Sequence, residues 1–149
     1  MNTDKLLWIV MVLIAGAFLP IQAGLNSRLG KAGESPVHAS TISFVVGAVA
    51  LILYLVVTKQ TVSWSGIKAA PTYLWIGGIL GAFYVTVIIL AFPKLGPGLT
   101  FGLVVAGQMI FSVLLEHFNV LVAQQQPISV GRIIGMLLVV AGVIIMKKF

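Results

Sequence analysis

Three polar side chains in an otherwise apolar run could contact a ligand or a transported ion. Gln108, Ser112 and Glu116 follow one another four residues apart in VAGQMIFSVLLEHF (105–118). At about 100° per residue, this spacing places them on one helical face within about 80° of arc. Ionisable groups within membrane helices are costly and are functional candidates by default, so Glu116 is the candidate ionisable group. The neighbouring His117 points to another side, and we predict either a further ligand contact or interfacial packing for it.

Glu116 has a second interpretation. A helix that begins at Gly98 brings it about 27 Å along the axis, near the far surface of a membrane. Arg132 opens the next apolar run on that same side. A carboxylate at a helix C-terminus opposes the helix dipole, so a nearby cation is a natural partner. The sequence therefore leaves open whether Glu116 lines a ligand site or pairs with Arg132.

The composition decides the class of protein that must position these residues. Of 149 residues, 60% are hydrophobic and only 8% are charged, which is typical of a membrane protein. The net charge of +6 comes from cations scattered between apolar runs, so we exclude nucleic acid as a partner. There is no cysteine, and the two histidines and three acids have no spacing suited to a metal or a nucleophile. We therefore predict no cofactor, no metal and no enzymatic activity.

Five apolar runs are each near the roughly 20 residues that a helix needs to cross a bilayer. Glycine, proline, serine and lysine punctuate the connections between them. The fold class predicted is an all-α, multi-pass protein of the cytoplasmic (inner) membrane. We expect one transmembrane domain over residues 1–149, surrounded by lipid bilayer, with helices at about 6–25, 37–57, 72–92, 98–120 and 129–146.

Polar residues in the first three runs are further candidates for ligand contacts. Pro20 cannot donate a backbone hydrogen bond, which predicts either a tolerated kink or a functional helix break. Gln22 and Asn26 follow four residues apart, as ligand contacts or as polar residues at a helix end. Ser43 near the start of the second helix is a candidate contact, and Tyr84 in the third is a candidate wall or gate.

Glycines four residues apart recur in three of the five predicted helices. Small residues at this spacing allow two membrane helices to approach closely. We therefore predict packing faces at Gly77, Gly81, Gly98, Gly102, Gly131 and Gly135.

The distribution of cations bears on orientation in the membrane. Five spans put the termini on opposite sides, with Lys5, Lys59, Lys68 and Arg132 on the N-terminal side, and Arg28, Lys31, Lys94, Lys147 and Lys148 on the other. The Lys/Arg bias that normally fixes orientation is almost absent. Either a partner sets the orientation, or the chain inserts both ways and pairs with an inverted copy, and we favour the inverted pair. Antiparallel pairing would bring one subunit's Gln22 and Asn26 level with Glu116 of the other.

Several segments together resemble the YdcZ-like family of the drug/metabolite transporter superfamily: PIQAGLNSRLG (20–30), ASTISFVVGA (39–48), WIGGILGAFYV (75–85), PKLG (93–96), VAGQMIFSVLLEHF (105–118) and RIIGMLLVVAGV (132–143). The resemblance implies a five-helix half of a ten-helix fold, completed by an inverted copy or a paralogue. Gly107, Gln108, Ser112, His117 and Phe118 match the pattern of the family's fourth helix. Glu116 stands where Asp is more frequent, and Asn119 stands where Gly is expected. The first helix lacks the embedded Glu of the superfamily's small multidrug exporters, since Asp4 precedes it.

The function predicted is secondary transport of a small polar or amphipathic metabolite, by alternating access between two inverted subunits. The alternative is a non-transporting accessory or scaffold subunit that binds another span, and an ion channel is a third possibility. Convergence of the polar residues on a cavity would distinguish a transporter from a scaffold. The substrate, the coupling ion, the direction of transport and the choice between homodimer and heterodimer are left open by the sequence.

Overall fold

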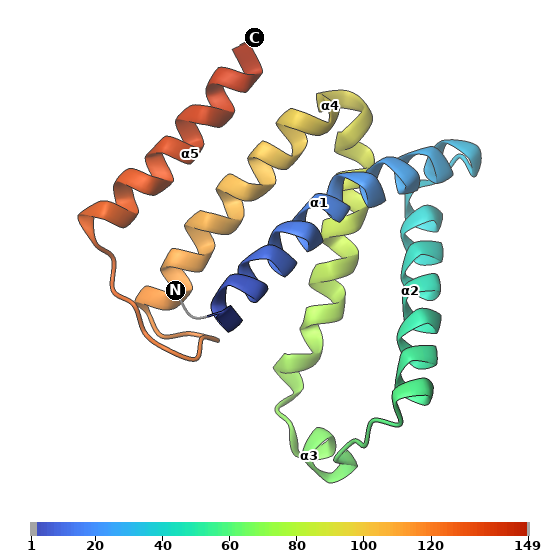
Figure 1. Ribbon diagram of the computed structural model, residues 1–149. Coiled ribbons are helices and arrows are strands. Elements are labelled where there is room, and N and C mark those ends of the chain that lie inside the picture. Colours follow the sequence, from blue (N-terminus) through green and yellow to red (C-terminus); the bar gives the residue numbers. More distant parts are fainter. Residues whose placement is uncertain (1–2, 149) are drawn as a thin grey trace. The chain divides into compact units, whose positions relative to one another are not determined.

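The computed structural model describes residues 3–148, and every regular element in that range is helical, which confirms the predicted all-α class (Figure 1). Its internal contacts divide the chain into two compact units, Met1–Pro93 and Lys94–Phe149. The elements in chain order are α1 (Thr3–Ala32), α2 (Pro36–Thr58), the short α3 (Trp64–Ala69), the 3-10 turn η1 (Thr72–Trp75), α4 (Ile76–His117) and α5 (Val130–Lys148).

Four helical stretches among the described residues are long and apolar enough to cross a membrane: Thr3–Ala32, Pro36–Thr58, Thr72–His117 and Val130–Lys148. The third contains 46 residues, more than twice the roughly 20 that one crossing requires. It is interrupted at Gly96, whose φ of 75° and ψ of 163° are not helical. The interruption lies where the sequence predicts the boundary between the third and fourth spans, and the stretch is long enough for both.

The interruption has a local cause in the sequence. Gly96 precedes Pro97, and proline disfavours the helical conformation of the residue before it. Glycine has no Cβ and can adopt the positive φ that this position requires. Three residues before Gly96, Pro93 also lacks a backbone donor. The helical stretch is therefore weakest at this point.

In the first unit, α1 and α2 pack against each other through small residues. Ala23, Asn26 and Gly30 are the buried residues of α1, and their spacing of three and four places them on one face. A Cβ added at Gly30 would lie 3.5 Å from the Cα of Pro36 and 3.3 Å from Ile89. The absence of a side chain at Gly30 thus allows the close approach of α1 to the start of α2.

The helix α1 is longer than the sequence indicated. It continues past the predicted end at residue 25 and stops at Ala32, so Gln22 and Asn26 lie inside the helix and not at its end. Pro20 lies within the same uninterrupted helix. Figure 1 shows α1 change direction part of the way along, as a proline kink does. Of the two interpretations of Pro20, the tolerated kink fits the structure and a loss of helical structure does not.

In the second unit, the part of α4 after Gly96 packs against α5. Buried Ala106 and Val113 on α4 and Val143 on α5 form its small apolar core. A Cβ added at Gly102 would meet Val143 at 3.1 Å and the tip of Met146 at 2.9 Å. The absence of a side chain at Gly102 therefore allows the close approach of Val143 and Met146.

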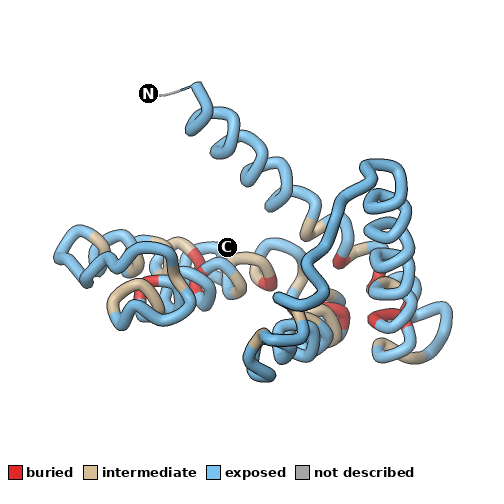
Figure 2. The backbone as a smooth tube through the Cα atoms, turned by 90° about the horizontal axis from the view of Figure 1, so that it is seen from below, coloured by how far each residue is buried: buried red, intermediate tan, exposed pale blue. Residues whose placement is uncertain are grey.

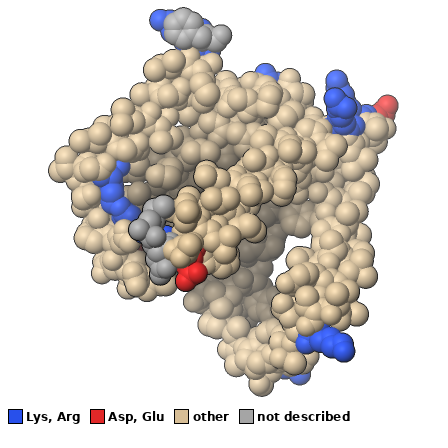
Figure 3. All heavy atoms as spheres, viewed as in Figure 1, with Lys and Arg blue, Asp and Glu red and all other residues tan. Residues whose placement is uncertain are grey.

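The surface of the chain is largely apolar and poorly covered by the chain itself. Figure 2 shows that most described residues are exposed, with only isolated buried positions. The exposed side chains include large hydrophobic ones on α1, α2, α4 and α5. In the view of Figure 3, charged side chains are a few isolated spots on an otherwise uncharged surface. A water-soluble monomer rarely exposes so much apolar surface, so lipid or another chain must cover it.

Candidate functional site

Two hydrogen bonds between polar side chains join α1 to α2 and α2 to the first part of α4 in the first unit. The Asn26 amide on α1 donates to the Ser43 hydroxyl oxygen on α2 at 3.1 Å, and Asn26 is only 7% exposed. On α2, Ser40 contacts Thr86 of α4 at 2.8 Å between hydroxyl oxygens, and Ser40 is 4% exposed. Polar groups within a bilayer must be satisfied internally, and hydrogen bonds between helices do so. We call these four residues the polar seam.

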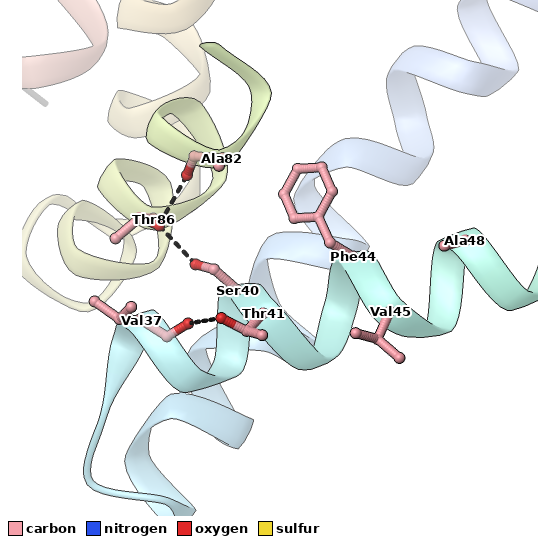
Figure 4. A pocket seen from close by; sticks show the side chains of 8 residues that line it. All are labelled: Val37, Ser40, Thr41, Phe44, Val45, Ala48, Ala82 and Thr86. Carbon is pink, nitrogen blue, oxygen red and sulfur yellow. Dashed lines mark hydrogen bonds between the residues drawn. The ribbon is translucent and has the colours of Figure 1, made fainter. Parts of the chain in front are cut away.

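The hydroxyls of Ser40 and Thr86 also bond to their own helices. Ser40 lies 3.1 Å from the Pro36 carbonyl. Thr86 lies 2.8 Å from the Ala82 carbonyl, and Figure 4 shows this bond together with the Ser40–Thr86 contact. Because two hydroxyl protons face three acceptor contacts, one of these contacts lacks a proton at any moment. The pair therefore has more than one arrangement of its hydrogen bonds at little cost.

A cavity of about 320 Å³ adjoins the seam at Ser43. Gln22, one turn before Asn26 on α1, lines it together with Ser43 of α2, and its other walls are Phe44, Gly47, Ala48, Leu51 and Val85. The predicted contacts Gln22, Asn26 and Ser43 are thus brought together, since Asn26 bonds the serine that lines the cavity. We call this the α1–α2 cavity.

A second cavity, of about 480 Å³, lies between α2 and the first part of α4. Its lining is Val37, Ser40, Thr41, Phe44, Val45, Ala48, Ala82 and Thr86, shown in Figure 4. Phe44 and Ala48 line both cavities, so these two residues are the shared wall. The ring of Phe44 lies against α4, where a Cβ at Gly81 would be 3.5 Å from it.

In the second unit, Glu116 forms an ion pair with Arg132, which is the pairing that the sequence left open. The carboxylate at the end of α4 accepts from the guanidinium near the start of α5, and the side chains are 30% and 27% exposed. Arg132 also donates to the backbone and side-chain oxygens of Gln126 at 3.0 Å each. One cation therefore ties together the end of α4, the connecting loop and the start of α5.

His117 stabilises the same loop. Its Nδ1 accepts from the backbone N–H of Ile128 at 3.2 Å, and its carbonyl accepts from the Gln125 amide at 2.8 Å. The ring contacts Phe118 in an edge-on arrangement, with 4.9 Å between ring centroids. The accepting Nδ1 must be unprotonated, so the hydrogen bond selects the neutral tautomer protonated on Nε2. This geometry places His117 in loop packing.

The remaining predicted contacts form none of the hydrogen bonds of the polar seam. Gln108 and Ser112 are exposed on α4, and within the described residues their side chains have no hydrogen-bond partner. Tyr84 is half-buried on the first part of α4. Among the predicted packing glycines, Gly81 and Gly102 face side chains of their own unit, whereas nothing lies within 4 Å of a Cβ added at Gly77, Gly98, Gly131 or Gly135.

Thr86 and Thr100 were not predicted from the sequence, and Ser40 was not among the predicted contacts. Ser40 and Thr86 form the α2–α4 part of the seam, and the signal was a hydroxyl residue inside an apolar run. Thr100 is 3% exposed, and its hydroxyl has no partner within the described residues. Its carbonyl partner one turn back would be Gly96, which is not helical. No group of three potential metal-ligating side chains occurs in the described part of the chain.

These features define a multi-pass α-helical membrane protein with hydrogen-bonded polar side chains between apolar helices. The chain belongs to the YdcZ family: the family described as "Putative inner membrane exporter, YdcZ" matches residues 7–145. The chain is similar to inner membrane protein YdcZ of Escherichia coli (strain K12), with 27% identity over 143 residues, 93% of each chain. No solved structure matches it. The family and the apolar helices make it a multi-pass protein of the inner membrane, with a transporter-like role.

Proposed function

We propose that the protein is a secondary transporter of a small polar or amphipathic metabolite that works by alternating access. The observation that carries this proposal is the buried Asn26–Ser43 hydrogen bond beside the cavity that Gln22 lines. A scaffold that only packs against another span gains nothing from polar side chains in the wall of a cavity among its helices. The description of the family as an exporter supports the same function class.

We further propose that two inverted subunits, identical or paralogous, form the working transporter. The near-even distribution of cations supports insertion in both orientations. Gln108 and Ser112 are exposed and without partners in the described residues, and polar groups left against lipid are costly. A second subunit would cover them and use the open glycines Gly131 and Gly135 for close packing.

In this arrangement the predicted site residues have different roles. Gln22, Asn26 and Ser43 contact the substrate or position its contacts, and Gln108 and Ser112 on α4 are further polar contacts. Tyr84 is a wall or gate. The Glu116–Arg132 pair is the ionisable group available for coupling, and His117 follows Glu116 in the chain.

The transport proposal is tested with purified protein in liposomes and a mixture of small metabolites, followed by mass spectrometry of the vesicle contents. We expect saturable uptake of a chemically related subset, and at least about tenfold slower uptake for Asn26→Leu, which removes the buried amide. Thr58→Val is the matched control, because the Thr58 hydroxyl bonds to the Tyr54 carbonyl of its own helix and Thr58 lines neither cavity. Liposomes that stay inert to every metabolite class would favour the accessory-subunit alternative.

The orientation proposal has its own experiment. C-terminal reporters specific for each side of the membrane should both give signal, because the Lys/Arg bias is nearly balanced. Two lysines added within residues 93–97 should shift the population toward one orientation. If the unmodified protein reports from a single side, dual insertion is wrong, and an oppositely oriented paralogue is the form of pairing that remains.

A further inference from the structure

We propose that the α1–α2 cavity binds an uncharged amphipathic molecule, with an apolar body and one hydroxyl or amide group. This inference rests on the proposed transport function and specifies the substrate class of that same site. It is drawn from the lining of the cavity, from the hydrogen-bonding groups that remain unused there, and from the cost of charge at this depth in a bilayer.

The lining of the α1–α2 cavity carries no charge. None of the residues that line the cavity is ionisable, and the same holds for the second cavity beyond Phe44. Moving a charged ligand to membrane depth without a counter-charge costs several kcal/mol by insertion scales. The described ion pair, Glu116–Arg132, belongs to the other unit and both partners are already engaged. A neutral ligand is therefore the one that these walls complement.

The cavity lining contains hydrogen-bonding groups that are available to a ligand. The Asn26 amide donates to the Ser43 oxygen, so the Ser43 proton stays available to a ligand. The Gln22 amide has no partner in the described residues, and it offers both a carbonyl acceptor and N–H donors. A hydroxyl or amide both donates and accepts and can satisfy this pair. A carboxylate has nothing to donate to the Gln22 carbonyl, and an ammonium group cannot accept from Ser43.

The rest of the cavity lining is apolar and would surround the apolar body of the ligand. Beyond Gln22 and Ser43 the lining is aromatic and aliphatic, with Phe44, Leu51 and Val85 around the small residues Gly47 and Ala48. A volume of about 320 Å³ is within the range of small-molecule sites. Phe44 also lines the cavity in Figure 4, so its ring is an aromatic wall shared by both cavities.

The test uses four probes that share one apolar body: naphthylethanol, naphthylethylamine, naphthylacetate and ethylnaphthalene. Binding to the full-length protein in lipid nanodiscs is measured by fluorescence, with empty nanodiscs subtracted. We expect the alcohol to bind at least about tenfold more tightly than the amine or the carboxylate, because the site offers no counter-charge. It should bind about fivefold to tenfold more tightly than ethylnaphthalene, which makes no hydrogen bond.

Variants assign the binding to this cavity. Gln22→Leu and Ser43→Ala should weaken the alcohol about fivefold each and leave ethylnaphthalene unchanged. Gly47→Leu should abolish binding of both, since it places a side chain in the cavity. Gly16→Leu is its matched control: nothing lies within 4 Å of a Cβ added at either glycine, and Gly16 does not line the cavity.

The outcomes separate this inference from the transport proposal. The inference is overturned if ethylnaphthalene binds as tightly as the alcohol and the Gln22 and Ser43 variants leave the affinity for the alcohol unchanged. The cavity would then be a groove for an acyl chain. Preferential binding of a charged probe overturns it as well, while saturable uptake in liposomes would leave the transport function standing. Selective, Gln22-dependent binding of the alcohol without uptake supports the ligand class and contradicts transport.

Discussion

The ion pair between Glu116 and Arg132 leads to a prediction that separates structural from functional use of the carboxylate. Glu116→Gln keeps the shape of the side chain and removes its charge. The guanidinium of Arg132 then retains two hydrogen bonds to Gln126, at 3.0 Å each, so it is not left unpaired. Arg132→Gln removes all three interactions at once and should destabilise the protein more.

The magnitude follows from the exposure of the pair. Fully exposed pairs contribute about 0.2–1 kcal/mol, and breaking a buried pair costs about 3–5 kcal/mol. With side chains 30% and 27% exposed, we expect about 1 kcal/mol of destabilisation for Glu116→Gln. That corresponds to a melting temperature lower by about 2–4 °C for a chain of this size. We expect about 2 kcal/mol for Arg132→Gln, and a coupling of about 1 kcal/mol between the two changes.

The assay is thermal unfolding of the purified variants in detergent, run as a double-mutant cycle. Glu34→Gln is the matched control, because Glu34 is exposed and has no ion pair within the described residues, and it should change stability by less than about 0.5 kcal/mol. The unmodified protein, the two single variants and the double variant are also tested for ligand binding across pH. A coupling near zero would refute the stabilising role of the pair. If Glu116→Gln flattens the pH dependence of binding, the carboxylate also acts on the ligand.

Four further substitutions test other parts of the structure. Gly102→Leu should destabilise by about 1–3 kcal/mol in thermal unfolding, because its Cβ alone would meet Val143 at 3.1 Å. Nothing lies within 4 Å of a Cβ added at Gly135, so Gly135→Leu should leave the unfolding temperature unchanged. It should weaken dimerisation as measured by light scattering. Gly96→Ala should cost about 1–3 kcal/mol in unfolding, since φ is 75° there, and an unchanged value would contradict the observed backbone. Thr100→Val should raise stability by about 1 kcal/mol, because its hydroxyl has no partner in the described residues, and a loss would reveal one.

Local sequence signals account for the helices and for the interruption at Gly96. The length and apolar content of each run predict membrane helices, and the prolines around Gly96 predict the break that α4 contains. The end of α1 was predicted too early because Ser27, Arg28 and Lys31 indicated an exit from the bilayer. The helix continues to Ala32, however, since Gly30 packs closely against Pro36 and Ile89.

The candidate site could be predicted only in part, because its contacts join helices distant in sequence. Helical spacing puts Gln22 and Asn26 on neighbouring turns of one face, but it cannot reveal which residue of α2 lies opposite. The partner of Asn26 is Ser43, 17 residues away in sequence. The Ser40–Thr86 contact spans 46 residues, and in a single sequence each hydroxyl could equally bond only to its own helix. For Glu116, charge alone suggested the right partner.

The positions of charged and neutral polar groups have a consequence for selectivity. The charged residues of the described chain lie near helix ends, in the connections or beside the interruption at Gly96, as Arg28, the Glu116–Arg132 pair and Lys94 do. The seam inside the first unit is built of amide and hydroxyl groups instead. A hydrogen bond between membrane helices contributes on average about 0.6 kcal/mol, so a ligand that offers an equivalent bond can replace one at little net cost. A charged contact at the same depth could not be exchanged so readily, because its opening would leave an unpaired charge. We therefore expect hydrogen-bond matching at Gln22 and Ser43 to select the substrate, and any coupling to an ion to act through the Glu116 end of α4.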